Sequence, residues 1–107
     1  MKFDTIIYEK KDGIAYITLN RPHVLNATSP AMFRELPQAW SDFAQDNSLS
    51  VAIVTGAGEG FSSGVDLKEF KGQMKDEVAK YSYASLKLTA RQNGIFKPVI
   101  AAINGIC

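Results

Sequence analysis

Two short, continuous runs of apolar residues constrain the fold of this chain more than any other feature. The runs are VAIVT at residues 51–55 and VIAAI at residues 99–103, and each is followed by a turn that contains glycine. Strands that are apolar on both faces are typical of a parallel sheet lying between helices. The two runs therefore predict two buried strands of an α/β sheet.

The N-terminal segment predicts a β-hairpin. Residues 5–9 and 14–19 are rich in β-branched and aromatic side chains, and the segment Lys11–Gly13 between them ends in an Asp-Gly pair. This pair favours a tight turn between antiparallel strands. Pro22 cannot donate to a strand ladder, so a loop is expected to follow the second strand as far as Ala27.

A helix is predicted to begin at Ser29 and Pro30, because serine caps an unpaired amide and proline suits the first helical turn. Pro37 lies inside the helical pattern and predicts a kink or a break there. The apolar positions follow at spacings of three and four, which places them on one helix face. They are Phe33, Leu36, Trp40 and Phe43.

Further along, the sequence predicts a glycine-rich loop at 56–64, a short helical turn at 66–70 and a longer helix at 75–93 that Gly94 ends. The order of elements is that of one α/β domain over residues 1–107. No helix follows the last predicted strand, so we expect an uncovered apolar sheet face. We take the chain to be a fragment or to be completed by another chain.

Composition excludes several classes of function. The chain of 107 residues carries 12 Lys and Arg against 11 Asp and Glu, a net charge of +1, which favours neither nucleic acid nor an anionic membrane. The longest apolar run, 99–103, is too short to span a bilayer. The single Cys107 and single His23 predict no internal disulfide and no metal site. We expect a cytoplasmic protein, with the mitochondrial matrix as the alternative.

The segment GFSSGVDL at residues 60–67 matches the G-x-S-x-G pattern of a serine nucleophile at Ser62. That pattern needs a turn directly after a strand, but the predicted strand ends near Thr55, and His23 precedes the serine instead of following it. A nucleophilic Ser62 is therefore the weaker alternative. Neither common phosphate-loop pattern fits, because no Lys-Ser or Lys-Thr pair follows and Phe61 stands where the third glycine of G-x-G-x-x-G is needed.

A third interpretation uses the backbone of this loop. The glycines between positions 56 and 64 permit positive φ angles and close approach of a ligand, and a helical turn near Asp66 would leave its first amides unpaired. An amide near Val65 could then hold the oxygen of a thioester as it gains negative charge, as an oxyanion hole does. The alternative is that the glycines only form a surface loop.

Three segments resemble motifs of the crotonase superfamily, the enoyl-CoA hydratase/isomerase family, in the same order. They are ITLNRPHVLNATSPAM (17–32), VAIVTGAGEGFSSGVDLKEF (51–70) and KPVIAAINGIC (97–107). The resemblance implies an α/β fold with the crotonase-like ββα spiral core. Residues 1–107 would be the N-terminal part of its single domain, starting with the β-hairpin and incomplete at the C-terminal end.

The resemblance also implies an acyl-CoA site that uses no cofactor and no metal, the coenzyme A thioester being the substrate. The Val65 N–H would be the catalytic group, as one of two oxyanion-hole amides. Lysine or arginine is common in the family near the position of His23, so contact with the CoA phosphates would be weaker or absent here. The substrate- and CoA-binding positions would be His23, Val24, Leu25, Ala27, Ser63, Gly64, Val65, Asp66, Leu67 and Lys68.

In complete family members, the second oxyanion amide, the catalytic carboxylates and the trimer-forming region follow the position of Cys107. The resemblance therefore implies part of a lyase or isomerase of fatty acid metabolism, a homo-oligomer (trimer or hexamer) when complete and inactive as an isolated fragment. Asp66 and Glu69 are weaker candidates for acid/base groups, since nothing predicts a raised pKa for them. The alternative is a naturally truncated, non-catalytic protein that binds acyl-CoA or docks onto family partners.

Overall fold

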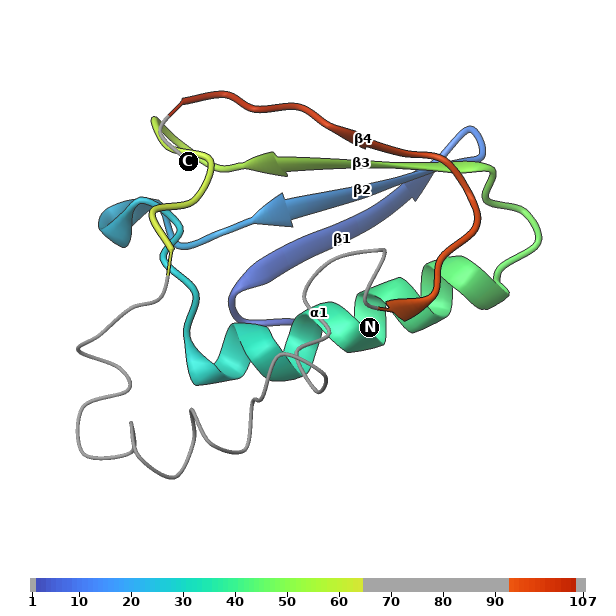
Figure 1. Cartoon of the computed structure of the whole chain (residues 1–107), viewed down its shortest axis with the longest axis horizontal. Coiled ribbons are helices and arrows are strands. Elements are labelled where there is room, and N and C mark those ends of the chain that lie inside the picture. The colour runs from blue at the N-terminus through green and yellow to red at the C-terminus, as the bar shows by residue number, and fades with distance from the viewer. Residues whose placement is uncertain (1, 65–92, 106–107) are drawn as a thin grey trace.

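Residues 2–64 and 93–105 are described by the computed structural model, and within them a four-stranded sheet packs against one long helix (Figure 1). The strands lie in the order β1-β2-β3-β4. The elements are β1 (Ile6–Lys11), β2 (Ile14–Leu19), the 3-10 turn η1 (Pro22–Val24), α1 (Pro30–Gln45), β3 (Val51–Gly56) and β4 (Val99–Ala101). The predicted α/β fold with an N-terminal hairpin is confirmed.

The hairpin pairs β1 and β2 antiparallel, from Ile6 opposite Leu19 to Lys11 opposite Ile14. Lys11 therefore belongs to the strand, and its placement in the turn was wrong. The turn is shorter because two residues suffice: Asp12 and the glycine after it both have positive φ angles, 53° and 77°. Such a turn matches the twist of the flanking strands and lets them pair to their ends.

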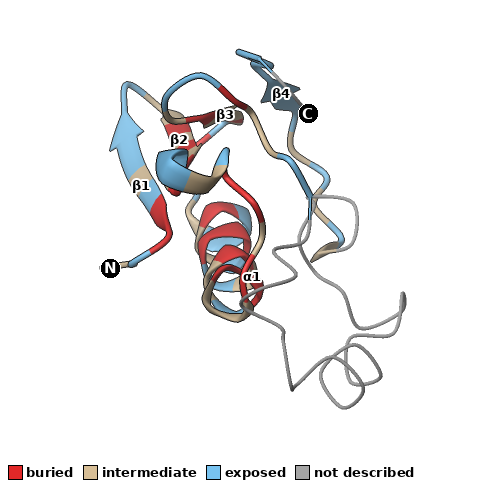
Figure 2. Ribbon diagram, turned by 90° about the vertical axis from the view of Figure 1, so that its left-hand side faces the viewer, coloured by how far each residue is buried: buried red, intermediate tan, exposed pale blue. Residues whose placement is uncertain are grey.

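Strand β3 lies parallel to both β2 and β4, with Ile17 opposite Val54 and Val54 opposite Ala101. The connection from β2 to β3 contains α1, as a parallel pair requires. The side of α1 that faces the strands is buried, whereas its opposite side is largely exposed (Figure 2). The core therefore lies between the sheet and this one helix.

Helix α1 begins where the sequence predicts. The Ser29 hydroxyl accepts a hydrogen bond from the Met32 amide at 3.3 Å, and Pro30 occupies the first turn. The four side chains expected on one face are all buried. They are Phe33, Leu36, Trp40 and Phe43.

No break occurs at Pro37, because α1 is a single helix from Pro30 to Gln45. Of the two predicted alternatives, the break is therefore wrong, and the kink stays a prediction. A proline inside a helix costs roughly 3 kcal/mol through its missing N–H and its steric clash. Each buried Leu or aromatic side chain contributes about 1.5–3 kcal/mol, and α1 buries several. Packing on both sides of Pro37 outweighs the local penalty.

Strand β4 is not buried, which contradicts the prediction for the second apolar run. Regular pairing covers only Val99–Ala101, and Val99, Ile100 and Ile103 expose 36%, 54% and 60% of their surface. A strand is buried on both faces only where other elements cover it. Among the described elements β4 pairs only with β3, and α1 covers the other end of the sheet (Figure 2). The expected uncovered apolar face is present in this part of the chain.

Lys97 attaches the segment before β4 to the end of α1. Its Nζ donates to the carbonyls of Phe43 and Asp46, both at 2.8 Å, and lies 5.0 Å from the centroid of the Phe43 ring. The last carbonyls of a helix lack partners within the helix, and a cation there also opposes the negative end of the helix dipole. Lys97 therefore caps α1 from more than 50 residues further along the chain.

Polar contacts hold β1 to this same C-terminal end of α1. The Tyr8 hydroxyl donates to Asp42 at 2.6 Å, and Lys10 Nζ lies 2.8 Å from carboxylate oxygens of both Asp42 and Asp46. Hydrogen bonds from Lys10 and then from Tyr8 lower the pKa of Asp42. Burial, followed by the hydrogen bond to Asp42, raises the pKa of Tyr8.

The short helical turn predicted at 66–70 and the helix predicted at 75–93 lie almost wholly outside the described residues. Gly94, the predicted end of that helix, has a φ of 65°, the left-handed conformation that glycine adopts readily. No helix within the described ranges has the length and apolarity needed to span a bilayer.

Candidate functional site

The loop after β2, residues 21–28, has an unusual backbone. Two successive residues, Leu25 and Asn26, adopt left-handed conformations with φ angles of 52° and 56°. Their amides are satisfied inside the loop, by the Pro22 carbonyl at 3.2 Å and the Arg21 carbonyl at 2.8 Å. Left-handed conformations are strained for most residues and persist where the surroundings enforce them.

The side chain of Asn26 holds the loop in this conformation through hydrogen bonds. Its side chain is fully buried; the carbonyl oxygen accepts from the Arg21 amide at 2.7 Å, and the amide nitrogen donates to the carbonyls of Ala57 and Gly60 at 2.9 and 2.7 Å. The side chain thereby joins the loop after β2 to the loop after β3. The sequence prediction omitted Asn26 from the site, although asparagine tolerates left-handed conformations better than its neighbours do.

Asn104 holds the loop after β3 from the other side. Its amide nitrogen donates to the carbonyls of Gly58 and Gly60 at 3.0 and 3.3 Å, and its oxygen accepts from the Gly56 amide at 3.1 Å. Packing here is tight: a Cβ on Gly56 would lie 2.4 Å from the Gly60 carbonyl, and one on Gly105 would lie 1.9 Å from the Glu59 carbonyl. Glycine is required at these two positions because the backbones approach so closely.

The predicted substrate- and CoA-binding positions fall in two segments, one at 23–27 and one that begins at Ser63, and these segments are in direct contact. The Ser63 amide donates to the Leu25 carbonyl at 3.0 Å, and the Ser63 hydroxyl donates to the Val24 carbonyl at 3.3 Å. The Thr28 amide donates to the Gly64 carbonyl at 2.6 Å. Segments almost 40 residues apart in sequence thus form one surface.

The predicted site residues differ in accessibility. His23, Leu25, Ser63 and Gly64 are exposed, and Val24 is half-buried. Ala27 is buried, and its carbonyl accepts from Arg21 Nη1 at 2.5 Å. The other predicted positions lie outside the described residues, so the oxyanion role stays a prediction. These positions are Val65, Asp66, Leu67 and Lys68.

Ser62 has the contacts of a structural serine. Its hydroxyl donates to the Asn26 carbonyl at 3.0 Å and accepts from the Gly64 amide at 3.3 Å. A backbone carbonyl cannot act as the base that activates a nucleophilic serine. Strand β3 ends at Gly56, which leaves five residues before Ser62, whereas a nucleophile elbow follows its strand directly. These contacts argue against a nucleophilic role.

An apolar cavity of about 310 Å³ lies beside Ser62, between the sheet and α1. It is lined by Leu19, Thr28, Met32, Leu36, Trp40, Val54, Phe61, Ser62, Val99 and Ala101. None of these side chains is ionisable at neutral pH, so the lining itself offers no acid or base. Within the described part of the chain, no cluster of His, Cys, Asp or Glu side chains is suited to hold a metal ion.

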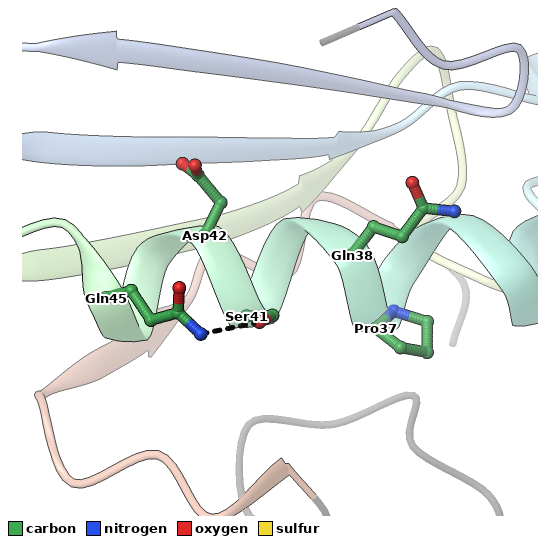
Figure 3. A pocket seen from close by; sticks show the side chains of 5 residues that line it. All are labelled: Pro37, Gln38, Ser41, Asp42 and Gln45. Atoms are coloured by element: carbon green, nitrogen blue, oxygen red, sulfur yellow. Dashed lines mark hydrogen bonds between the residues drawn. The ribbon is translucent and has the colours of Figure 1, made fainter.

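A second hollow, of about 420 Å³, lies on the outer surface of α1 and has no catalytic chemistry (Figure 3). All of its lining residues belong to the one helix, and Gln45 donates to Ser41 at 3.3 Å. Its carboxylate, Asp42, is engaged by Tyr8 and Lys10. This hollow therefore offers no alternative to the surface formed by the two loops, which stays the candidate site.

The profile of the enoyl-CoA hydratase/isomerase family matches residues 9–107. This chain belongs to that family. A solved enoyl-CoA hydratase/isomerase from Mycobacterium paratuberculosis matches with a TM-score of 0.84 and 38% identity, over 99% of this chain and 42% of the other. The resemblance to the crotonase superfamily, as its N-terminal portion, is thereby confirmed.

Two curated relatives of the enoyl-CoA hydratase/isomerase family are similar over nearly the whole chain. A hydroxycinnamoyl-CoA hydratase-lyase from Pseudomonas fluorescens is 33% identical, and a short-chain-enoyl-CoA hydratase from Clostridium acetobutylicum is 35% identical. They are matched over 99% and 98% of this chain but over only 40% and 41% of their own lengths. The chain thus spans about two fifths of these relatives.

Proposed function

We propose that this chain binds acyl-CoA thioesters as the N-terminal part of an enoyl-CoA hydratase or isomerase, and that it supplies one backbone amide, that of Val65, to an oxyanion hole. The contact between the two loops supports this proposal most strongly. Ser63 bonds to the backbone of Val24 and Leu25, so the segments expected to bind CoA and the thioester share one surface. The named relatives act on CoA compounds, which agrees with it.

The proposed chemistry is stabilisation of an enolate. A backbone N–H directed at the thioester oxygen donates a hydrogen bond that strengthens as negative charge develops on that oxygen. The stronger bond lowers the barrier to adding water across the double bond that is conjugated with the carbonyl. Proton transfer needs a separate acid or base. The cavity beside Ser62 lacks one. We assign proton transfer to the carboxylates that follow the position of Cys107 in complete family members. No cofactor takes part, and the complete enzyme is a homo-oligomer of the cytoplasm.

Calorimetric titration with crotonyl-CoA tests the binding. The unmodified chain should bind crotonyl-CoA but should not hydrate it above the uncatalysed rate. Hydration is measured as the loss of absorbance of the conjugated thioester. A chain that binds no acyl-CoA contradicts the proposed function. Hydration far above background contradicts the assignment of the carboxylates to other parts of the protein.

Two glycines provide a matched pair of variants. Gly64 and Gly94 have φ angles of 99° and 65°, and a Cβ on either would meet no atom of the described residues within 4 Å, so we expect both alanine variants to suffer mainly backbone strain. Gly64→Ala should weaken acyl-CoA binding about tenfold, because strain of 1–3 kcal/mol shifts the loop. Gly94→Ala should bind like the unmodified chain. Equal affinities of the two variants would contradict the location of the site.

A further inference from the structure

The segment after β4 contains an Asn-Gly pair, Asn104 and Gly105, and the fold needs both residues. The Asn104 side chain donates to the carbonyls of Gly58 and Gly60 at 3.0 and 3.3 Å. A Cβ at position 105 would clash with the Glu59 carbonyl, so a side chain there would force the two backbones apart. The close contact of this segment with the loop after β3 therefore places an asparagine directly before a glycine.

An asparagine followed by glycine can react with its own main chain, because glycine has no side chain to shield the backbone nitrogen. The Gly105 nitrogen loses its proton to hydroxide and bonds to Cγ of Asn104. The Cγ–Nδ2 bond breaks, and Nδ2 takes a proton from water and leaves as ammonia. Water then opens the cyclic imide at either carbonyl, which gives aspartate or isoaspartate. In sum, one water is consumed and one ammonia is released.

Hydrogen bonds, and not burial, restrain this reaction in the folded chain. Both residues of the pair are exposed, so water and hydroxide reach them. The two ends of the Asn104 amide group are nevertheless held, since Nδ2 donates to two carbonyls and Oδ1 accepts from the Gly56 amide at 3.1 Å. Ring closure makes Cγ tetrahedral and draws it onto the Gly105 nitrogen. The side chain must therefore first leave the loop after β3.

The backbone that carries Asn104 is held as well. The Thr55 hydroxyl donates to the Ala102 carbonyl at 2.9 Å, and the Ala102 amide donates to the Val54 carbonyl at 2.8 Å. These two bonds attach the segment before Asn104 to the end of β3. Removing the Thr55 hydroxyl should loosen this segment while leaving the reacting pair unchanged.

We propose that Asn104 is a site of spontaneous deamidation, which the loop after β3 keeps closed and whose product releases that loop. Aspartate or isoaspartate at position 104 has lost both N–H donors and presents a carboxylate to the carbonyls of Gly58 and Gly60. The contact cannot form again, because two acceptors now face each other. This inference is independent of the proposed function, since it involves no ligand.

Peptide mapping of the whole chain after incubation at mildly alkaline pH measures the reaction. The chain supplies its own reference: Asn93-Gly94 is followed by isoleucine, as Asn104-Gly105 is. In urea the two pairs should therefore react at equal rates. Without urea, Asn104 should react roughly tenfold to a hundredfold more slowly than it does in urea, the effect of two or three net hydrogen bonds.

A matched pair of variants tests whether the contact with β3 controls the rate. Thr55→Val removes the hydroxyl and keeps the shape, so Asn104 in the folded variant should react roughly threefold to tenfold faster. Thr18→Val makes the same change on β2, directly opposite Thr55 in the sheet, and should react like the unmodified chain. Equal rates in the two variants overturn the inference, as does an Asn104 that reacts equally fast with and without urea.

The product tests the release of the loop. Ion exchange separates the reacted chain by its additional negative charge, and this fraction should unfold at a lower urea concentration than the fresh chain. An unchanged unfolding midpoint overturns the inference. If Thr55→Val does not fold, the rates of the unmodified chain with and without urea decide together with this midpoint.

Discussion

Asn26 and Asn104 donate to the same acceptor, the carbonyl of Gly60, at 2.7 and 3.3 Å. They approach it from loops 34 residues before and 44 residues after it in the sequence. The loop after β3 is thereby held between the loop after β2 and the segment after β4. This arrangement explains how a glycine-rich loop can keep a defined backbone, as a binding site requires.

Replacing either asparagine by aspartate should therefore destabilise the fold. Asn26→Asp removes both donors and places a carboxylate against two carbonyls in a fully buried position, which should lower the free energy of unfolding by about 2–4 kcal/mol. Asn104 is exposed, so Asn104→Asp should cost about 1 kcal/mol. Asn47→Asp, in the exposed turn after α1, is the control and should change stability by less than about 0.5 kcal/mol.

Urea unfolding of the single and double variants measures these effects. The double variant Asn26→Asp with Asn104→Asp should be less destabilised than the sum of the two, because both side chains act on Gly60. If the loss in the double variant equals the sum of the two single losses, the two asparagines are not coupled through the Gly60 carbonyl.

Lys97 should stabilise the end of α1. Lys97→Met removes the donor to the Phe43 and Asp46 carbonyls but keeps a long apolar side chain over the Phe43 ring. We expect a loss of about 1–2 kcal/mol in the free energy of unfolding, and faster hydrogen exchange in the last turn of α1. Lys11→Met, on the exposed end of β1, makes the same change away from α1. Equal losses for the two variants would contradict the capping role.

Asp42 should make stability depend on acid pH. Hydrogen bonds from Lys10 and Tyr8 lower its folded pKa, so its contribution is present above the unfolded value of about 3.9 and is lost as the pH falls through the lower folded value. The unmodified chain should therefore exceed Asp42→Asn in stability near neutral pH. The difference should shrink below about pH 4.

Thermal unfolding of both chains from pH 7 to pH 2 checks this dependence. Asp12→Asn, in the hairpin turn, carries the same charge change and serves as the control. A difference between the unmodified chain and Asp42→Asn that stays constant over this range would rule out a stabilising ionised Asp42.

Pro37 should lower the stability of α1 even though the helix continues through it. Pro37→Ala restores a backbone N–H in the helix interior and removes the clash of the ring, so it should raise the free energy of unfolding by about 1–3 kcal/mol. The half-buried ring loses some packing, which sets the lower end of that range. Chemical denaturation measures the change, and a less stable alanine variant would show that packing of the ring dominates.

Short sequence patterns were sufficient to predict several secondary-structure elements. The Asp12–Gly13 pair and its flanking alternation predicted the hairpin, and Ser29 with Pro30 predicted the start of α1. These signals act over a few residues, through φ preferences and unpaired amides near the residue itself. The family motifs likewise indicated the two loops that the structure brings together.

Other features depend on contacts between residues that are far apart in the sequence, and only the tertiary structure decides them. The continuity of α1 through Pro37 follows from burial against the sheet, and the exposure of β4 follows from which faces other elements cover. The same holds for Asn26, because its side chain donates hydrogen bonds to carbonyls more than 30 residues away. The sequence by itself determined where strands, helix and glycine loops lie. Only the fold decided which backbone groups meet, because a hydrogen bond between distant segments leaves no local pattern.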